Sequence, residues 1–445
     1  LRVGVPPLDD EASHQVCSSS RALLRCREAG QFPGRHIGMA AAPEGYAQLG
    51  APLAADGATT RQAAWGRKPL IGLGLAAAVA GSVALLRAAP SPSAVAVLPA
   101  PTSLVVKDTL GGPGSPLAKQ VVVGMDTNVN LHIAWNDWKD WSKEMAPWWT
   151  EDMIYDFGYV GEWNFGPTHG LREWFDGEHM HFNGALPDCQ WLDVIRAATN
   201  QTCTSASYGL ARWTGPFAGV PPPASKPWVR VHDLDFYLLE GNRIKINWCI
   251  IDVVDLFEQV GYQVLPPAPL PMDGYKAPNA MDGFPAPLSA AVDPRDTVVS
   301  EKVWRAAVRE DYLLGTGGAR WWAEEIVWYG PGGVGTAHSR QEYLTHFIKP
   351  LHAGFSDISM QLDMIVCEGK YCGAHFYLHA THTGEWLGEK ATGKRVRIRC
   401  GAHAHLEGGK IVEGWLIIDV PRAFADMGVD LYGRARKVAL SVAKA

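Results

Sequence analysis

Two stretches of the chain repeat one arrangement of residues, and this repeat limits the fold more than any other feature. Trp148-Trp149 recurs as Trp321-Trp322, and further matches are His169 with His338, Glu173 with Glu342, Asp188 with Asp357, Cys203 with Cys372, Thr214-Gly215 with Thr383-Gly384, Trp248 with Trp415, Asp252 with Asp419 and Gly261 with Gly428. The offset between matched residues changes slightly along the chain, as loop insertions would produce. The pattern predicts two tandem copies of one fold, each of about 130 to 150 residues.

The second copy carries the clearest motifs. A His382-Thr383-Gly384 turn is followed by Gly408-Gly409-Lys410, which predicts a β-hairpin turn between two alternating runs. The strand after it contains Glu413-x-Trp415-x-x-x-Asp419. Together these motifs resemble the SnoaL-like polyketide cyclase family of the nuclear transport factor 2-like superfamily. The resemblance implies an α+β fold, namely two tandem cone-shaped barrels of curved antiparallel sheet, each wrapped on helices around an apolar pocket.

Composition shifts divide the chain into segments. We expect an N-terminal extension, a hydrophobic helix, a Pro/Ala/Ser linker, a first domain, a Pro-rich linker, a second domain and a tail, with boundaries at residues 1–68, 69–87, 88–118, 119–265, 266–295, 296–432 and 433–445. The first Met is Met39, so residues 1–38 are interpreted as an extension of the gene model.

The uncharged run from Pro69 to Leu86 is at the lower length limit for a membrane-spanning helix. Arg67-Lys68 precede it, which favours a cytoplasmic N-terminus and a single-pass anchor with the globular part lumenal or extracytoplasmic. The alternative is a cleaved signal, with Ala94-Val95-Ala96 as the cleavage site, and hence an organelle-targeted or secreted protein.

The overall composition is that of a globular chain. Apolar residues make up 47% and charged residues 19%, and a formal net charge of −6 provides no basic face for nucleic acid. Eighteen tryptophans fit either large core anchors or an aromatic-lined cavity. Among eight cysteines, Cys367 and Cys372 flank a possible Gly-Lys turn that would place them across a hairpin, although two free thiols are the preferred interpretation.

The resemblance suggests acid–base residues in the second copy. Family members close a ring by an intramolecular aldol step, in which a carboxylate removes a C–H proton and a histidine assists. The resemblance therefore implies His382, His403, Asp419 and Glu413 as catalytic candidates. A metal site at the His403-x-His405 pair is disfavoured because Glu407 is too close to the pair and Glu413 too distant, so neither metal nor cofactor is predicted.

Several further residues are expected to form the pocket, and they are Trp322, His379, Trp386, Trp415, Leu416, Trp248 and Asp252. One register argument opposes catalysis. The family's base position is occupied by Leu416 in the second copy and by Cys249 in the first, while Asp419 lies on the opposite strand face, where it fits a helix cap. His403 shares a face with Arg399, and only a bulge at Gly401 would turn it inward.

The first copy is predicted to be degenerate, because Leu210, Trp213 and Ile246 replace His379, His382 and Glu413. Two functions remain open. One is a cofactor-independent cyclase or isomerase that acts on a hydrophobic small molecule in the second domain. The other is a non-catalytic ligand-binding or scaffold protein anchored at a membrane through residues 69–87. Tandem copies also suggest an intramolecular pseudo-dimer, with a homodimer as the alternative.

Overall fold

The computed structural model describes residues 115–132, 135–158, 161–163, 167–272, 292–316 and 320–443. The predicted extension, the predicted hydrophobic helix at 69–87 and most of both linkers lie outside these residues. Among the helices that are described, none is long and apolar enough to cross a membrane. Membrane anchorage through residues 69–87 therefore stays a prediction.

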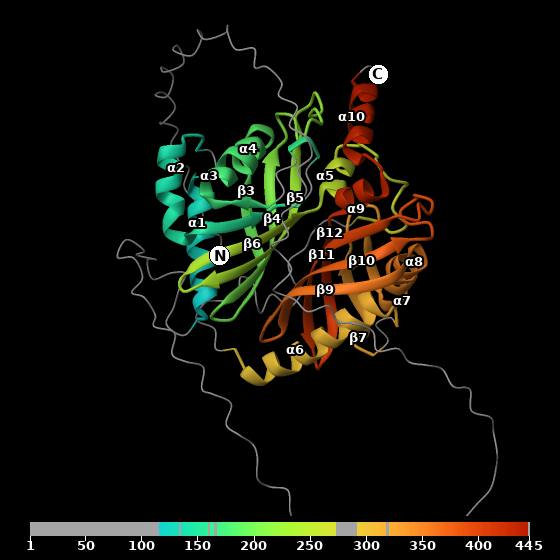
Figure 1. The fold of residues 1–445 in the computed structure, drawn as a ribbon. Helices are drawn as coiled ribbons and strands as arrows, with labels where there is room; N and C mark the ends of the chain where they lie inside the picture. Colours follow the sequence, from blue (N-terminus) through green and yellow to red (C-terminus); the bar gives the residue numbers. More distant parts are fainter. Residues whose placement is uncertain are drawn as a thin grey trace, which may run out of the picture. The chain divides into compact units, whose positions relative to one another are not determined.

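The first domain is a six-stranded mixed sheet with helices gathered on one side (Figure 1). Its strand order is β2-β1-β6-β5-β4-β3. The strands are β1 Trp149–Asp156, β2 Thr168–His169, β3 Gln190–Ala198, β4 Thr202–Arg212, β5 Trp228–Glu240 and β6 Arg243–Ile251. The helical segments are α1 Leu117–His132, α2 Trp138–Met145, η2 Ala146–Trp148, η3 Gly161–Trp163, α3 Gly170–Trp174, η4 Phe175–His179, α4 Met180–Ala185 and α5 Val253–Glu258.

The second domain repeats this order as β8-β7-β12-β11-β10-β9. Its strands are β7 Trp322–Tyr329, β8 Thr336–Ser339, β9 Phe355–Glu368, β10 Tyr371–His382, β11 Arg395–Glu407 and β12 Lys410–Ile418. Its helical segments are α6 Pro294–Val308, η5 Arg309–Leu313, α7 Arg340–Tyr343, η6 Leu344–Ile348, α8 Lys349–Gly354, α9 Val420–Met427 and α10 Leu431–Val442. Residues predicted to be a C-terminal tail thus form most of α10, which Asp430 caps.

Two similar sheet–helix domains fit the predicted tandem α+β fold, but the expectation of a wholly antiparallel barrel is wrong. β1 runs parallel to β6, and β7 runs parallel to β12. The reason is that several helices separate β1 from the hairpins that follow, and a connection of that length permits parallel pairing. Hairpins join the remaining long strands, and Gly408 and Gly409 form the predicted turn between β11 and β12 with positive φ angles of 55° and 74°.

The two sheets pack against each other through the faces that point away from their helices. One hydrophobic cluster combines Phe236 and Trp248 of the first sheet with Met364, Tyr371 and Trp415 of the second. Successive residues of a strand alternate between this cluster and the helix-covered core, so that Trp248 belongs to the former and Cys249 to the latter. We call the packed region the intersheet interface.

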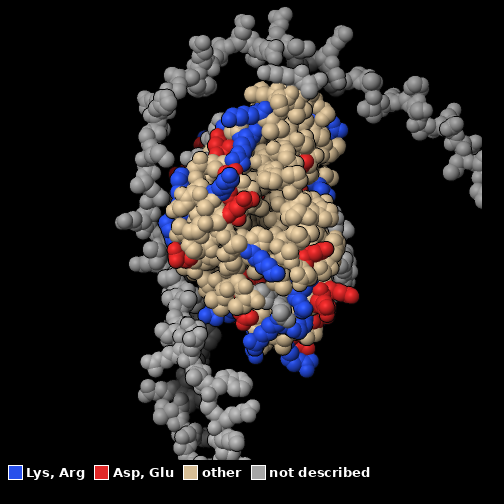
Figure 2. All heavy atoms as spheres, turned by 90° about the vertical axis from the view of Figure 1, so that its right-hand side faces the viewer, with Lys and Arg blue, Asp and Glu red and all other residues tan. Residues whose placement is uncertain are grey.

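The Cys367 and Cys372 side chains are joined in a disulfide, which differs from the preferred expectation of free thiols. The two residues lie directly opposite each other in β9 and β10, and their Cα atoms are 4.1 Å apart. The Gly369-Lys370 turn therefore sets the geometry for the bond. On the face shown in Figure 2, Lys and Arg are interspersed with Asp and Glu among uncharged residues.

Candidate functional site

A cavity lies in the first domain, between the inner face of the sheet and the helices that cover it. Its empty volume is about 780 Å³, including the opening to solvent. Aromatic rings and carboxylic acids both line it, and the acids are Asp126, Glu178, Asp193, Asp233 and Asp235. Concave sites in which aromatic side chains surround converging polar groups are typical of small-molecule binding.

Two of these acids form the chemical centre of the cavity. Asp233 and Asp235 are two residues apart on β5, so their side chains project from the same face, and they are 4% and 7% exposed. Ser207 Oγ donates a hydrogen bond to Asp233 Oδ2 at 3.0 Å, and Cys249 Sγ donates to Oδ1 at 3.3 Å. The amide of Asn247 is hydrogen-bonded to Asp235.

Burial raises the pKa of Asp233 to about 6, and burial together with the neighbouring Asp233 charge raises the pKa of Asp235 well above its usual value. The cause is that two carboxylates side by side in a low-dielectric cavity repel each other, so the pair retains one proton. Asp235 is the member of the pair that keeps its proton to the higher pH, and Asp233 is the member that ionises first. One member can then accept a proton while the other donates a hydrogen bond.

Three of these side chains also offer ligand atoms to a cation. Oxygen and sulfur atoms of Asp233, Asp235 and Cys249 lie within 4.8 Å of one another. However, burial and the nearby carboxylates raise the pKa of Cys249 well above its usual value, and its thiol serves as a donor to Asp233. A metal would need the thiolate, whereas the hydrogen bonds and pKa shifts favour a shared proton.

A further acid stands on the helical wall of the cavity. Glu178 belongs to the π-helical turn η4, and Trp174 Nε1 donates to its Oε2 at 2.6 Å. Burial raises the pKa of Glu178 to about 7. Beside it, burial lowers the pKa of His179, whose Nε2 lies 2.8 Å from the backbone oxygen of Trp135. This wall therefore adds a second carboxyl group that exchanges its proton near neutral pH.

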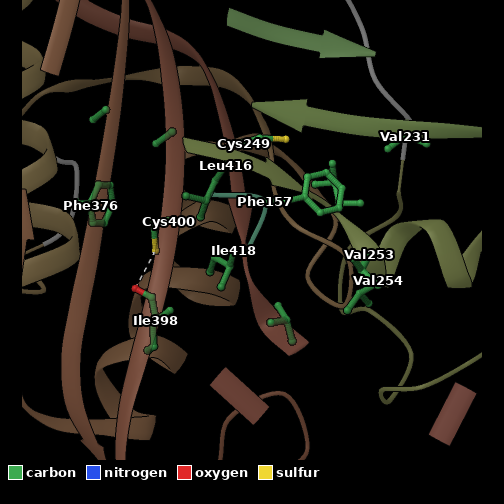
Figure 3. Close-up of a cluster of buried hydrophobic side chains, with 14 of the residues drawn as sticks. Phe157, Val231, Cys249, Val253, Val254, Phe376, Ile398, Cys400, Leu416 and Ile418 are labelled. Carbon is green, nitrogen blue, oxygen red and sulfur yellow. Dashed lines mark hydrogen bonds between the residues drawn. The ribbon is translucent and has the colours of Figure 1, made fainter. Parts of the chain in front are cut away.

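The equivalent positions of the second domain are apolar. Strand registers align Ser207 with Phe376, Asp233 with Cys400, Asp235 with Ala402, Asn247 with Gly414 and Cys249 with Leu416. Phe376, Cys400 and Leu416 lie in the buried hydrophobic core of this domain (Figure 3). The inner sheet face of the second domain therefore carries no carboxyl group at these positions, and a working site in that domain stays a prediction.

The four predicted catalytic residues have separate partners. His403 Nε2 lies 2.6 Å from Thr204 Oγ1 of the first domain, and burial lowers the His403 pKa to about 3. Glu413 Oε2 bonds His405 Nδ1 at 2.7 Å. His382 Nδ1 lies 3.1 Å from Thr392 Oγ1, and Asp419 accepts from the Arg422 backbone N–H at 3.1 Å as the cap of α9. The structure does not bring these four side chains around one cavity.

His403 lies on the intersheet interface because β11 has no bulge at Gly401. The pairing of β11 with β12 is continuous from Cys400 to His405, so Gly401 does not carry the bulge that would turn His403 inward. A Cβ atom at Gly401 would lie 2.9 Å from the Phe236 ring and 3.0 Å from Ile250. Glycine at this position lets the two sheets approach closely, which is a packing role.

The predicted pocket residues are similarly dispersed. Trp322 and Leu416 lie in the core of the second domain, and Trp386 packs edge-on to Phe355. Trp248 and Trp415 belong to the intersheet interface. The remaining two have other environments: His379 is half-buried beside Tyr377, and Asp252 caps α5 and accepts a hydrogen bond from Gly332 N at 2.7 Å.

Comparison with known proteins places the sequence motifs in a family. Residues 317–427 match the model of the SnoaL-like polyketide cyclase family. The second domain is SnoaL-like. This confirms the resemblance predicted from the sequence, and the matched span contains every motif on which that prediction depended.

Solved structures show the same kind of likeness over about a third of the chain. One is IdmH from Streptomyces antibioticus, assigned as a polyketide cyclase, with 23% identity, a TM-score of 0.25, and coverage of 31% of this chain and 99% of IdmH. A SnoaL-like polyketide cyclase from Jannaschia sp. CCS1 has 16% identity, a TM-score of 0.26, and coverage of 32% and 90%. TsrD from Streptomyces laurentii has 17% identity, a TM-score of 0.26, and coverage of 31% and 98%. No curated protein matches the chain.

The family motifs and the carboxylate cavity thus lie in different domains. The SnoaL-like domain has the recognisable sequence and an inner sheet face that is apolar at the matched positions, whereas the first domain has the polar cavity. A signal for the cavity was present in the sequence. Asp233 and Asp235 alternate with Leu234 and Phe236, and two acids on one face of an otherwise apolar strand are unusual unless that face binds something.

Proposed function

We propose that the first domain binds a small hydrophobic carbonyl compound and uses Asp233 and Asp235 for acid–base chemistry of the cyclase or isomerase type. The observation that carries the proposal is the pair itself, two adjacent carboxyl groups that share a proton in a cavity walled by aromatic rings. Such a pair offers a base and a hydrogen-bond donor at the same pH without any cofactor.

The proposed steps conserve atoms and charge. The ionised Asp233 removes a proton from the carbon next to a carbonyl group, and the protonated Asp235 donates a hydrogen bond to the enolate oxygen that forms. In a cyclisation, the enolate carbon bonds to a second carbonyl carbon of the same molecule, and the new alkoxide takes the proton from Asp233. In an isomerisation, Asp233 returns the proton to a different carbon. Neither route transfers electrons to or from another molecule.

The family match supports the substrate class. IdmH and the Jannaschia protein are assigned as polyketide cyclases, and polyketides are hydrophobic molecules with several carbonyl groups. Aldol cyclisation of such a molecule is the reaction that we propose. The aromatic wall formed by Trp141, Trp149 and Trp174 would bind the hydrocarbon part of the substrate.

For the SnoaL-like domain we propose a non-catalytic role as the packing partner of the first domain. The specific observation is that Cys400 and Ala402 stand at the positions of the two acids. Leu416 likewise stands at the position of Cys249. This revises the scaffold hypothesis so that it applies to one domain of the chain. Attachment to a membrane through residues 69–87 remains part of the proposal for the whole protein.

Hydrogen exchange of a model ketone tests the proposal without knowledge of the substrate. The α-hydrogens of 2-tetralone exchange with D₂O through its enolate, and proton NMR measures the rate. We expect the full-length chain to accelerate this exchange above the buffer rate, with saturation as the ketone concentration rises. An exchange rate equal to that of buffer at all ketone concentrations would rule out the carbon-acid chemistry proposed here.

The exchange rate should depend on pH with a defined sign. Asp233 must be ionised to accept a proton, so the rate should rise with pH through the pKa of about 6. At pH 5 we expect a rate about tenfold below the plateau, because only about a tenth of Asp233 is then ionised. The rate should fall again at higher pH, where Asp235 loses its proton. A rate that stays constant between pH 5 and pH 7.5 would contradict the assignment of Asp233 as the base.

A further inference from the structure

Two tryptophans at matched positions in the two domains differ in one hydrogen bond. Trp149 begins β1 and pairs with Ile244 of β6, just as Trp322 begins β7 and pairs with Ile411 of β12. Both side chains are 1% exposed. Trp322 Nε1 donates to Asp311 Oδ2 at 2.7 Å, whereas Trp149 Nε1 has no hydrogen-bond partner among the residues that the structure describes.

Trp149, whose indole N–H has no partner within the described residues, is one of the residues that line the first-domain cavity. A buried indole N–H without an acceptor is costly and uncommon in folded proteins, so its persistence needs an explanation. In the SnoaL-like domain the acceptor for the indole N–H is the buried carboxyl group of Asp311. In the first domain, an acceptor that enters the cavity from outside would satisfy the same donor.

A second polar atom on the cavity wall supports this interpretation. Asn247 Oδ1 is buried and likewise has no partner within the described part of the chain. Its counterpart in the SnoaL-like domain is Gly414, where a Cβ atom would lie 2.7 Å from the Trp322 ring and 2.9 Å from the Trp328 ring. Aromatic rings therefore fill this region in the SnoaL-like domain, whereas in the first domain Asn247 is one of the residues that line the cavity.

We propose that the Trp149 indole N–H binds a carbonyl oxygen of the ligand, and that the first domain therefore selects ketones over hydrocarbons of the same shape. The inference rests on the proposed function in one respect, namely that the ligand occupies this cavity. In an aldol closure the substrate has two carbonyl oxygens. Asp235 serves the enolate oxygen, and we assign the indole N–H of Trp149, which has no acceptor within the described residues, to the carbonyl group under attack.

Two probes that differ in a single oxygen test this assignment. 2-Acetonaphthone has the ketone, and 2-ethylnaphthalene has the same ring system without it. Equilibrium dialysis gives the affinity of each probe for the full-length chain, for Trp149→Phe and for the matched control Trp322→Phe. The control removes the indole that is already bonded to Asp311 in the SnoaL-like domain.

We expect Trp149→Phe to weaken 2-acetonaphthone binding about tenfold, as the loss of one buried hydrogen bond would. Its affinity for 2-ethylnaphthalene should change less than twofold, which also shows that the cavity remains folded. Trp322→Phe should leave both affinities unchanged. The assignment is overturned if Trp149→Phe weakens both probes equally, if it weakens neither, or if the unmodified chain does not bind the ketone more tightly than the hydrocarbon.

This experiment is independent of turnover, because neither outcome depends on proton transfer. If Trp149→Phe weakens the binding of 2-acetonaphthone alone but 2-tetralone does not exchange, the catalytic proposal fails and the ligand assignment stands. If exchange occurs and Trp149→Phe changes the affinities of both probes by the same factor, the reverse holds. Asp233→Asn should retain the preference for the ketone, since Asp233 is not assigned to the carbonyl group under attack.

Discussion

Replacing Asp233 by Asn should slow the enzyme-dependent exchange of 2-tetralone hydrogens by about two to four orders of magnitude, the usual contribution of a positioned base. The amide keeps the shape of the side chain and can still accept a hydrogen bond from Ser207, but it cannot take up the proton. The measurement is the NMR exchange rate at pH 7.5. Asp311→Asn is the matched control, because burial raises the pKa of Asp311 to about 7 and yet this acid lies in the SnoaL-like domain.

The same substitution should raise the stability of the protein at pH 8, although it lowers the exchange rate. The folded-state pKa of Asp233 is raised, so its contribution to stability is fully present below the unfolded pKa of about 3.8 and is lost as pH rises through about 6. Asn carries no charge to bury, so Asp233→Asn should melt at a higher temperature than the unmodified chain at pH 8. This gain should be absent at pH 4. Loss of exchange together with lower stability at pH 8 would instead indicate a structural role for Asp233.

The fold was predictable because its signals are local. The Gly408-Gly409 turn, the Trp415 and Asp419 spacing and their repetition at Trp248 and Asp252 depend on neighbouring residues only. The parallel pairing of β1 with β6 was not predictable in this way. This pairing joins segments that are separated by most of the domain. The residues of a strand do not specify which other strand will be its neighbour in the sheet.

Sequence motifs do not specify which way a side chain points, and for this reason the sequence did not indicate the site that we propose in the first domain. Histidines near the family motif favoured the second copy, but β11 places His403 on the intersheet interface, where Thr204 and Phe236 contact it. The first copy was considered degenerate because it lacks those histidines. Its polar residues are instead on the inner face of β5 and β6, where the family motif does not extend.

The burial of Arg399 could not be predicted from the sequence either. This residue lies on the face of the second sheet that points away from its helices. Arg395, Arg397 and Arg399 alternate along β11 and share one face, and three cations in a row are typical of a face in contact with solvent. The first two are exposed, but Arg399 is only 2% exposed because the row passes from solvent into the intersheet interface. A strand pattern identifies the residues that share a face, and it does not identify where a second sheet begins to cover that face.

Arg399 is therefore expected to have a large effect on stability. Its Nη2 donates to the Asp156 backbone oxygen at 2.9 Å, its Nη1 lies 3.4 Å from Asp156 Oδ1, and its Nε lies 2.9 Å from His375 Nε2. Burial alone would raise the pKa of Asp156, but the charge of Arg399, with that of His375, holds this pKa below its usual value. The two domains are thus connected by a buried ion pair.

Replacing Arg399 by Met should lower the free energy of unfolding by about 3 to 5 kcal/mol, because it leaves the Asp156 carboxylate buried without its cation. Urea denaturation at pH 7 measures the loss. Arg305→Met is the control, since the exposed Arg305–Glu301 pair should be worth at most about 0.5 kcal/mol. The double variant Arg399→Met/Asp156→Asn should recover much of the loss, because the second change removes the unpaired charge.

The pH dependence separates this electrostatic cause from a simple packing defect. A depressed folded-state pKa gives stability that is present above the unfolded value of about 3.8 and is lost as pH falls through the folded value. Without the guanidinium, burial raises the pKa of Asp156, so the carboxyl group of Arg399→Met takes up a proton at a higher pH than that of the unmodified chain. The difference in stability between the two should therefore shrink from pH 7 to pH 4. A loss that is the same at pH 4 and pH 7, and that Asp156→Asn does not relieve, would mean that Arg399 stabilises the interface by filling space and not by its charge.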